Sequence, residues 1–447
     1  MRTSRFPHPI TLLVGCILLG AVLSYILPAG QYDRQDDPAT GRSVVVAGTY
    51  HEVERNPVGL FGAMVAIPKG LADAADIIFL VFLIGGAFTV VDRTGALRSG
   101  VDWLVRHLHG RDMLVIPVIS LAFGTAGALE NMQEEIIALI PVLLILTRRL
   151  GFTPTIAVAM SAGAAIVGSA FSPINPFQVG IAQKLAELPL LSGGMFRLTF
   201  LVIALAMWIW GTMRFAARTR TEPETVETSE SESVSARAAA ILVCVLLTFA
   251  VLVFGLLRLG WDFDQMSAVF FTMGVVAGLI GGLGVTGTAE GYVAGFRSMA
   301  FAALLIGFAR AIFIVLDQGR IVDTIVYGMF TPIANLPVAI SALGMMGAHI
   351  AIHVPVPSVS GHAVLTMPVL VPLSDLLGLS RQVMILTYQY GGGLLDMITP
   401  TNGALLAILA AGGVKYNEWI RFALRNYLAL LALGAVAILV GIATGLQ

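Results

Sequence analysis

Long apolar runs separated by short polar segments dominate the sequence. Three of the clearest are 12–27, 191–210 and 427–446, which consist mainly of aliphatic and small residues. Such runs are typical of membrane-spanning helices, because a helix of about 20 apolar residues crosses the hydrocarbon core of a bilayer. The pattern therefore predicts an all-α polytopic membrane protein, with the lipid bilayer as its solvent.

Composition agrees with this pattern. The chain has 447 residues, of which 57% are hydrophobic and only 12% are charged, whereas about 25% of a soluble domain is charged. The formal net charge is −1 and no basic run is present, so we expect no nucleic-acid partner. Cys16 and Cys244 lie within apolar runs. We interpret them as buried small hydrophobes, and we predict no disulfide, metal or cofactor.

The two halves of the chain resemble each other. Asp92 and Asp317 each follow an apolar run that contains "LIG", and they lie 225 residues apart. The segment "SPINP" matches "TPTNG" further along, which aligns Asn175 with Asn402 at a spacing of 227 residues. A spacing that is nearly constant over much of the chain indicates an internal duplication.

The duplication predicts three parts. The first repeat half covers 1–213 and the second covers 238–447. Between them, 214–237 contains the acidic stretch "TRTEPETVETSESES", which is typical of a flexible polar linker.

The distribution of Lys and Arg predicts the orientation. We expect an uncleaved first helix, a cytoplasmic N-terminus and a cytoplasmic linker in the plasma (inner) membrane. The second half has one additional helix, about 266–284, which inverts everything that follows it. The two repeats are therefore predicted to be inverted, and the C-terminus to be external.

Each half is predicted to contain a re-entrant helical hairpin. The legs of the first, about 112–148, are short, since roughly 16 residues span roughly 24 Å of a hydrocarbon core that is roughly 30 Å thick. Arg111 precedes this hairpin and Arg148 and Arg149 end it, so we expect it to enter from the cytoplasm. The second, about 335–376, is predicted to enter from outside, with its tip at "PVPSVSGH".

Each half also contains an interrupted helix, with breaks at 172–176 and 399–403. Irregular backbone at membrane depth survives only where it lines a cavity or is buried in protein. Paired breaks in inverted halves indicate the binding site of a transporter. The helix N-termini that the breaks expose can bind a carboxylate, and the freed carbonyls can bind Na⁺ or an ammonium group.

Three glutamates in "ALENMQEE" lie beside the first predicted tip. We expect Glu130 or Glu134 to contact substrate or a coupling cation, because intramembrane ionisable groups are functional candidates. The alternative is that they cap the second leg or pair with an arginine. Glu135 points about 100° away from Glu134 on a helix, and a capping role is preferred for it. Partial desolvation would let Glu134 exchange a coupling proton.

The candidate site combines the tips and the breaks. The alternatives to ligand contact are helix capping for the asparagines and packing around the second tip for its hydroxyls and histidine. The predicted substrate-binding residues are Glu130, Asn131, Glu134, Ser172, Asn175, Ser358, Ser360, His362, Thr399, Thr401 and Asn402. The predicted coupling-ion residues, for Na⁺ or H⁺, are Glu134, Ser172, Asn175, Thr399 and Asn402.

Two further features carry alternatives. His349 and His353 have the i, i+4 spacing of zinc ligands, but "HExxH" is absent, so we interpret them as packing residues. Arg310 lies within an apolar run. It is predicted to pair with Glu134 or Asp396, or to hold a substrate carboxylate.

The segments "SPINPFQVGIAQ", "VPSVSGHAVLTMPVLVPLSDLLGLSRQ" and "YQYGGGLLDMITPTNGALLAILAAGGVKYNEW" carry a family resemblance. Over nearly the whole chain the sequence resembles the YfcC-like branch of the DcuC (C4-dicarboxylate carrier) family, in the ion transporter superfamily. The resemblance implies inverted repeats, two opposed hairpins, a transport domain that moves against a scaffold, and a homodimer. The first tip departs from the expected "GMxEE"-like pattern and is richer in polar residues.

The resemblance implies a secondary transporter of small carboxylate-bearing solutes, such as C4-dicarboxylates, by ion-coupled or exchange transport of the elevator type. Three acids and one arginine near the inferred site suit a cationic amino acid equally, so a basic amino acid antiporter, or an amino acid or peptide transporter, stays open. A channel and an intramembrane hydrolase are further alternatives. The sequence has no zinc motif and no pair of catalytic aspartates on helices, so we expect no enzyme.

Overall fold

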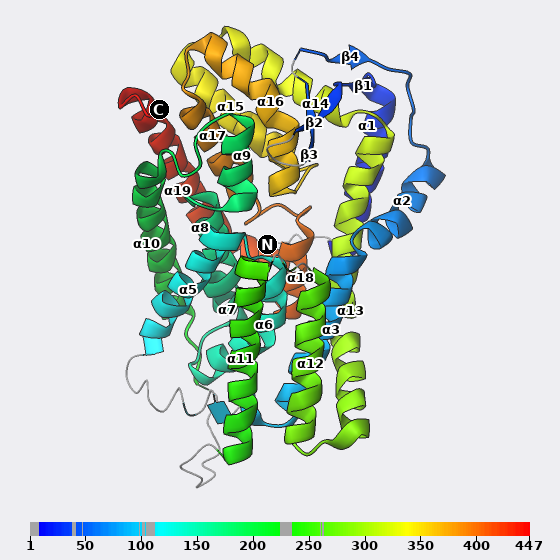
Figure 1. Ribbon diagram of the computed structural model, residues 1–447, viewed down its shortest axis with the longest axis vertical. Coiled ribbons are helices and arrows are strands. Elements are labelled where there is room, and N and C mark those ends of the chain that lie inside the picture. Colours follow the sequence, from blue (N-terminus) through cyan, green and yellow to red (C-terminus); the bar gives the residue numbers. More distant parts are fainter. Residues whose placement is uncertain are drawn as a thin grey trace, which may run out of the picture.

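The computed structural model describes residues 9–37, 42–46, 48–97, 99–100, 103, 112–223, 235–259, 261 and 263–447. Its described part is helical except for short strands near the N-terminus (Figure 1). Seven of the described helices are long and apolar enough to cross a membrane. The predicted all-α polytopic class is therefore confirmed.

The first half supplies one hairpin and one interrupted helix. The helices are α1 (Pro9–Ile26), α2 (Leu60–Asp73), α3 (Ala75–Arg93), η1 (Asp112–Leu114), α5 (Val115–Glu130), α6 (Glu134–Arg149), α7 (Pro154–Val158), η2 (Ala159–Gly163), α8 (Ala164–Ala170), η3 (Pro176–Gly180), α9 (Ile181–Leu185) and α10 (Gly194–Thr219). The strands β1 (Gly30–Gln31) and β4 (His51–Glu52) pair antiparallel, as do β2 (Arg34–Asp37) and β3 (Arg42–Val45).

The second half also contains a hairpin and an interrupted helix. Its helices are α11 (Ala236–Leu259), α12 (Phe263–Ile280), α13 (Gly284–Gln318), α14 (Val322–Phe330), η4 (Thr331–Asn335), α15 (Val338–His353), α16 (Val359–Leu377), α17 (Arg381–Tyr388), η5 (Gln389–Gly393), α18 (Gly403–Ala411) and α19 (Tyr416–Ala443). The segments η2, η3 and η5 are π-helical. In Figure 1 the α15–α16 pair lies in the upper part of the molecule and the α5–α6 pair lies lower.

Helix pairs occur where the sequence predicts hairpins. The turn 131–133 joins α5 to α6, and 354–358 joins α15 to α16. Helix α6 has only 16 residues, as predicted, but η1 and α5 together provide an 18-residue apolar stretch at 112–129 that reaches the length of a span. Arg111, on which the predicted cytoplasmic side partly depends, lies outside the described residues.

Helix α10 reaches into the segment predicted as the linker. Helix α10 continues to Thr219, past the predicted start of the linker at 214, because its apolar face stays packed: Phe215 contacts Phe422 of α19 at a ring-centroid distance of 4.9 Å. Helix α13 begins at Gly284, shortly after α12 ends at Ile280. Tyr292 fixes its first turns on α12 by donating to the Phe271 carbonyl at 2.6 Å. Within the linker, 224–234 lie outside the described residues.

Small residues bring the first hairpin close to the first interrupted helix. A Cβ on Gly127 of α5 would lie 2.0 Å from the Ala165 carbonyl oxygen, and one on Gly168 of α8 would lie 1.9 Å from the Gly124 carbonyl oxygen. Close approach of backbones through glycine is typical of helix packing in membranes. The tip of the first hairpin is thereby held against the first break.

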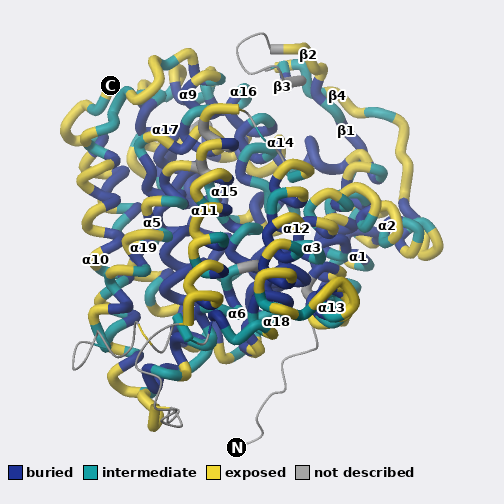
Figure 2. Tube along the Cα trace, turned by 60° about the horizontal axis from the view of Figure 1, so that its bottom comes forward, coloured by how far each residue is buried: buried dark blue, intermediate teal, exposed yellow. Residues whose placement is uncertain are grey.

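Buried side chains form two apolar cores. The larger one includes both hairpins, both interrupted helices, α1, α10 and α19. The smaller one joins α3, α11 and α12. Large apolar side chains on the outer faces of α10 and α11 are exposed (Figure 2), among them Trp210 at 62% and Leu246 at 69%. This distribution is typical of helices that face lipid.

Candidate functional site

A cavity of about 640 Å³ lies between the two hairpin tips, the second break, α13 and the junction of α2 with α3. This volume is in the range of sites for small molecules. Six of the predicted site residues line it: Asn131, Glu134, Ser358, Ser360, Thr401 and Asn402. The cavity thus brings together both tips and the second break.

Other predicted site residues lie behind the cavity wall. Ser172, Asn175, His362 and Thr399 are buried, with at most 2% of each exposed, and they do not line the cavity. The side chain of Glu130 lies outside the described residues. The first break therefore supports the site from behind, whereas the second break borders it.

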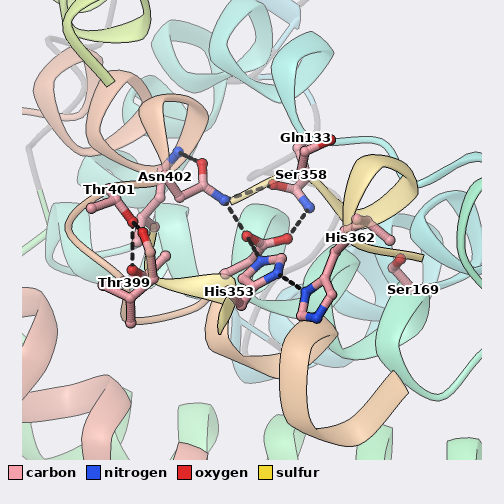
Figure 3. Close-up of polar contacts among 12 residues, drawn as sticks. Gln133, Ser169, His353, Ser358, His362, Thr399, Thr401 and Asn402 are labelled. Atoms are coloured by element: carbon pink, nitrogen blue, oxygen red, sulfur yellow. Dashed lines mark hydrogen bonds and ion pairs between the residues drawn. The ribbon is translucent and has the colours of Figure 1, made fainter. Parts of the chain in front are cut away.

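Asp396 is the centre of the polar contacts in the cavity wall, where its partners Gln133, His353 and Asn402 converge (Figure 3). Its Oδ2 accepts from Gln133 Nε2 at 3.1 Å. Its Oδ1 accepts from Asn402 Nδ2 at 2.7 Å and lies 2.9 Å from His353 Nε2. Gln133 belongs to the first tip, His353 to α15 and Asn402 to the second break, so one carboxylate connects both hairpins to the interrupted helix. Three donors on a buried carboxylate suit its ionised form.

Helix capping determines the orientation of these amides. Asn402 is the N-cap of α18, and its Oδ1 accepts from the Leu405 amide at 2.9 Å. Its Nδ2 must therefore point toward the cavity, where it donates to Asp396 and, at 3.2 Å, to Gln133 Oε1. Because Gln133 Oε1 accepts there, its Nε2 is the atom that faces Asp396.

The first break has the same capping geometry with neutral partners. Asn175 Oδ1 accepts from the amides of Phe177 and Gln178 at 2.9 and 3.0 Å. Its Nδ2 donates to the Gly127 carbonyl at 2.9 Å and to Ser169 Oγ at 3.3 Å. Ser169 in turn donates to Asn131 of the first tip at 2.5 Å. This arrangement holds tip and break together without a charged group.

A hydroxyl joins each break to the tip of its own hairpin. Ser172 donates to the Ala128 carbonyl at 2.6 Å, and Thr401 donates to the Val354 carbonyl at 2.6 Å. Thr399 and Thr401 share a hydrogen bond of 2.9 Å. Ser358 caps α16 by accepting from the Gly361 amide at 3.3 Å. Tip carbonyls left without helical partners are thereby satisfied.

The histidines are buried, as their interpretation as packing residues requires, but they also bond to one another. His353 Nδ1 lies 3.0 Å from His362 Nδ1, and His349 Nδ1 lies 2.9 Å from His362 Nε2. The nitrogens face each other at hydrogen-bond distance. Within the described residues, no group of three or more His, Cys, Asp or Glu side chains could hold a metal ion.

The predicted partners of Arg310 are wrong. Its guanidinium forms an ion pair with Asp73 at the end of α2, because α2 packs directly on α13. Arg310 still lines the cavity, with 43% of its side chain exposed. It is also not alone among the arginines of apolar helices. Arg197 of α10 is fully buried, and its Nε donates to Gln389 Oε1 at 2.7 Å.

Acidic side chains outnumber basic ones around the cavity. Its lining includes two arginines, Arg34 and Arg310, and five carboxylates, Asp73, Asp76, Glu134, Asp317 and Asp396. Both arginines are already paired, Arg34 with Asp323 at 2.8 Å and Arg310 with Asp73. The arrangement therefore favours a ligand with positive charge.

Glu135 has the predicted capping role. Its Oε2 accepts from the amide of Gln133, the N-cap of α6, at 3.1 Å. The importance of Gln133 and Asp396 was not predicted, although "GLLDMITPTN" shows Asp396 as an intramembrane carboxylate six residues before Asn402. The rule that selected the glutamates would have selected Asp396 as well.

The sequence matches a known family over most of its length. The family is described as the C4-dicarboxylate anaerobic carrier, and the match covers residues 6–443. An Escherichia coli (strain K12) protein with the name "Putative basic amino acid antiporter YfcC" is 31% identical over 94% of this chain and 93% of its own length. An uncharacterized protein of Haemophilus influenzae is 26% identical over 98% of this chain and 97% of its own length.

Two solved structures show a more distant similarity. The YdaH transporter of Alcanivorax borkumensis aligns with 98% of this chain and 99% of its own length, with 18% identity and a TM-score of 0.46. MtrF of Neisseria gonorrhoeae, described among antimetabolite efflux pumps, aligns with 97% of this chain and 95% of its own length, with 15% identity and a TM-score of 0.42.

Proposed function

The chain belongs to the C4-dicarboxylate anaerobic carrier family, and from this premise we propose that it exchanges a small cationic amino acid across the membrane. Family membership makes it a multi-pass membrane transporter and not an enzyme. Its partners are accordingly a small-molecule substrate and the lipid bilayer. The choice of substrate rests on the charge of the cavity.

The excess of carboxylates is the observation that carries the proposal. With Arg34 and Arg310 paired to aspartates, the carboxylates of Asp76, Glu134, Asp317 and Asp396 give the lining of the cavity an excess of acidic groups. A desolvated carboxylate is stable only with a cationic or hydrogen-bonding partner. An ammonium or guanidinium group of a substrate supplies such a partner at Asp396 and Glu134.

Helix N-termini supply the complementary site for the carboxylate of an amino acid. Gly403 and Ala404 begin α18, and Ser360 lies in the first turn of α16; all three line the cavity. Backbone N–H groups in a first helical turn have no partner in the preceding turn and carry partial positive charge. A substrate with one carboxylate and two cationic groups matches these features.

A C4-dicarboxylate is the second candidate, and the family description favours it. The two helix N-termini could each hold one carboxylate. The same cavity, however, would then place a dianion beside Asp76, Glu134 and Asp396. Electrostatic repulsion would have to be offset by protonation or by bound cations. The similarity to the relative named as a basic amino acid antiporter supports the cationic substrate instead.

The proposal includes the predicted mode of transport. The hairpins and interrupted helices share the larger core, whereas α3, α11 and α12 share the smaller one. We propose that the hairpins and interrupted helices move as a transport domain against a scaffold that contains α3, α11 and α12. We also propose that the two halves of the chain are inverted repeats and that the protein is a homodimer. The proposed location is the inner membrane, with the N-terminus cytoplasmic, the C-terminus external and H⁺ or Na⁺ as the coupling ion.

Counterflow in proteoliposomes tests the substrate. Purified protein is reconstituted into vesicles loaded with unlabelled L-arginine, L-lysine, succinate or fumarate, and uptake of labelled L-arginine or labelled succinate is followed. We expect uptake of labelled L-arginine only into vesicles that contain a cationic amino acid. Labelled succinate exchanging with internal succinate, with no exchange of L-arginine, would replace this proposal with the dicarboxylate carrier. Equal uptake into empty vesicles would indicate a channel.

A further inference from the structure

Three histidines of the second hairpin and Asp396 form one continuous hydrogen-bonded chain. Figure 3 labels two of its members, His353 and His362. The chain runs from Asp396 Oδ1 to His353 Nε2, from His353 Nδ1 to His362 Nδ1, and from His362 Nε2 to His349 Nδ1, at 2.9, 3.0 and 2.9 Å. All four side chains are buried, with at most 2% exposed. Asp396 lines the cavity, while His349 lies one helical turn farther from the tip than His353.

The proton count of this chain is well defined. A neutral imidazole has one N–H and one lone pair. With Asp396 ionised, His353 donates from Nε2 to the carboxylate, His362 donates from Nδ1 to His353, and His349 donates from Nδ1 to His362. Every bond then holds one proton. His349 Nε2 is left with a lone pair, and it is buried without a hydrogen-bond partner in the described residues.

We propose that His349, His362, His353 and Asp396 form a histidine relay that delivers the coupling proton to the substrate cavity. A proton from water binds His349 Nε2, and His349 releases its Nδ1 proton to His362 Nε2. His362 then releases its Nδ1 proton to His353 Nδ1, and His353 releases its Nε2 proton to Asp396 Oδ1. One proton enters and one arrives, and each N–H bond that breaks is matched by a new N–H or O–H bond.

The relay rests on the proposed function and gives it a coupling mechanism. Protonation of Asp396 removes a negative charge from the wall that would hold the substrate cation. A cation in the cavity stabilises ionised Asp396, and a proton on Asp396 weakens the binding of the cation. Proton and substrate therefore compete for one carboxylate, as exchange in opposite directions requires.

The glycine run "GGG" in η5 lets the backbone of η5 pack closely against the histidine rings of the relay. A Cβ on Gly392 would lie 3.1 Å from the Nδ1 and Cε1 atoms of His362 and 3.4 Å from His353 Nδ1. A Cβ on Gly391 would lie 3.0 Å from the Cβ of His349. The π-helical segment can thus approach the histidines closely, which excludes water from the hydrogen bonds between the rings.

The two ends of the relay have different surroundings: aromatic rings lie beside His349, and acidic side chains share the cavity with Asp396. Phe330 of α14 and Tyr388 of α17 contact the His349 ring at centroid distances of 5.3 and 5.6 Å. The Tyr388 hydroxyl also faces α16, where it donates to the Val359 carbonyl at 2.7 Å. Glu134 and Asp76 line the cavity with Asp396. Because His349 is fully buried, a proton can reach it only when the surrounding helices separate or admit water.

The charged groups of the remaining neighbours are engaged elsewhere or lie at the far ends of their helices. Asp323 of α14 pairs with Arg34, and Tyr327 of the same helix stacks on Tyr50 at 4.2 Å. Helix α19 carries Glu418, Arg421 and Arg425 in its first three turns, and α9 carries Lys184. The chemistry of the relay is therefore set by its own four members and by the acids of the cavity.

A variant that breaks the relay at its buried end tests the proposal. In His349→Asn the side-chain amide can still donate to His362, but the second nitrogen, which accepts the incoming proton, is removed. The matched control is His51→Asn, which alters a histidine with 53% of its side chain exposed, outside the relay. Two rates are measured in proteoliposomes: accumulation of labelled L-arginine driven by a pH gradient, and L-arginine exchange at equal pH.

We expect gradient-driven accumulation to fall by about tenfold or more in His349→Asn while exchange at equal pH stays within about twofold of the wild type. His51→Asn should leave both rates unchanged. Wild-type accumulation in His349→Asn would overturn the relay. An equal loss of both rates would also overturn it, because a purely structural role for His349 predicts that result.

A measurement without substrate separates the relay from the proposed function. In protein that carries ¹⁵N-labelled histidine, magnetic resonance detects couplings between ring nitrogens that share a hydrogen bond. We expect two couplings in the wild type, His349 to His362 and His362 to His353, and only the second in His349→Asn. Absence of both from the wild type would overturn the relay. If both are present and L-arginine is not exchanged, the relay stands and the proposed substrate fails.

Discussion

The two breaks share a geometry and differ in charge. At the first, Asn175 caps η3 and donates to Ser169 six residues earlier, at 3.3 Å. At the second, Asn402 caps α18 and donates to Asp396 six residues earlier, at 2.7 Å. Ser169 and Asp396 occupy equivalent positions, 227 residues apart, like the two asparagines. Both breaks thus have the same cap, but only the second carries a carboxylate six residues before its asparagine.

This difference separates a structural role from a functional one. The first break is buried, and its Asn175 amide donates to the Gly127 carbonyl and to Ser169. At the second break, the Asn402 amide donates to Asp396, a carboxylate that lines the cavity. Capping by an asparagine is common to both breaks, whereas the proposed substrate site needs Asp396, which belongs to the second.

Removing the charge of Asp396 should have the largest effect on function. Asp396→Asn keeps the shape of the side chain, so the protein should fold. Loss of a buried charged partner costs about 2 to 5 kcal/mol of binding free energy, which is roughly thirtyfold to several thousandfold in affinity. The rate of L-arginine exchange in proteoliposomes, followed over a range of L-arginine concentrations, measures this loss of affinity. The equivalent change in the first break, Ser169→Ala, should leave exchange largely intact, and equal losses in the two variants would remove the distinction between the breaks.

Removing the two asparagines should separate stability from transport. Asn175→Ala removes the cap of η3 and leaves the Gly127 carbonyl without its donor, which should destabilise the fold by about 1 to 3 kcal/mol. Asn402→Ala loses a comparable cap but also releases Asp396. Thermal unfolding in detergent and exchange per folded molecule are compared. We expect Asn175→Ala to lower the unfolding temperature and Asn402→Ala to lower exchange further at a similar unfolding temperature.

The hydroxyls that join tips to breaks should have smaller, matched effects. Ser172→Ala removes the hydrogen bond to the Ala128 carbonyl and the acceptor of the Ile174 and Asn175 amides. Thr401→Val removes the bonds to the Val354 carbonyl and to Thr399. Each such bond is worth about 1 kcal/mol. We expect similar shifts in the unfolding temperature. Thr401 also lines the cavity, so only Thr401→Val should change the apparent affinity for substrate. An affinity change in Ser172→Ala of the same size would place the first break in the site.

The smallest effect is expected at Arg310. Its pair with Asp73 is partly exposed, and exposed pairs contribute about 0 to 1 kcal/mol. Arg310→Gln should therefore leave the unfolding temperature nearly unchanged. It should leave L-arginine exchange intact or raise it, because a positive charge leaves the cavity. Loss of exchange would support the alternative in which Arg310 holds a substrate carboxylate.

Local signals were sufficient to predict the elements and the positions of the breaks. Apolar runs, the Pro- and Asn-bearing interruptions and the repeat between Asn175 and Asn402 are each contained in a short stretch of sequence. Glycine and capping chemistry act over a few residues, so hairpin tips could also be located. Local signals failed to predict a helix end where tertiary packing continues the helix through polar residues. Helix α10 is the example, because Phe215 packs on Phe422.

The charged contacts could not be predicted in the same way. Asp73 and Arg310 are 237 residues apart, and nothing in either neighbourhood indicates that α2 packs on α13. The i, i+4 spacing placed His349 and His353 on one helix face, but His362 comes from the other leg of the hairpin. Its position between them depends on the turn 354–358 and on the close approach of Gly392.

Calorimetric titration with L-arginine and with L-citrulline tests the central claim most directly, because the two ligands have nearly the same shape and differ in side-chain charge. We predict that the wild type binds L-arginine more tightly than L-citrulline by about 2 kcal/mol or more, and that Asp396→Asn removes most of this difference. Asp375→Asn, which removes a carboxylate paired with Arg381 away from the cavity, should preserve it. Equal binding of the two ligands by the wild type would contradict the account.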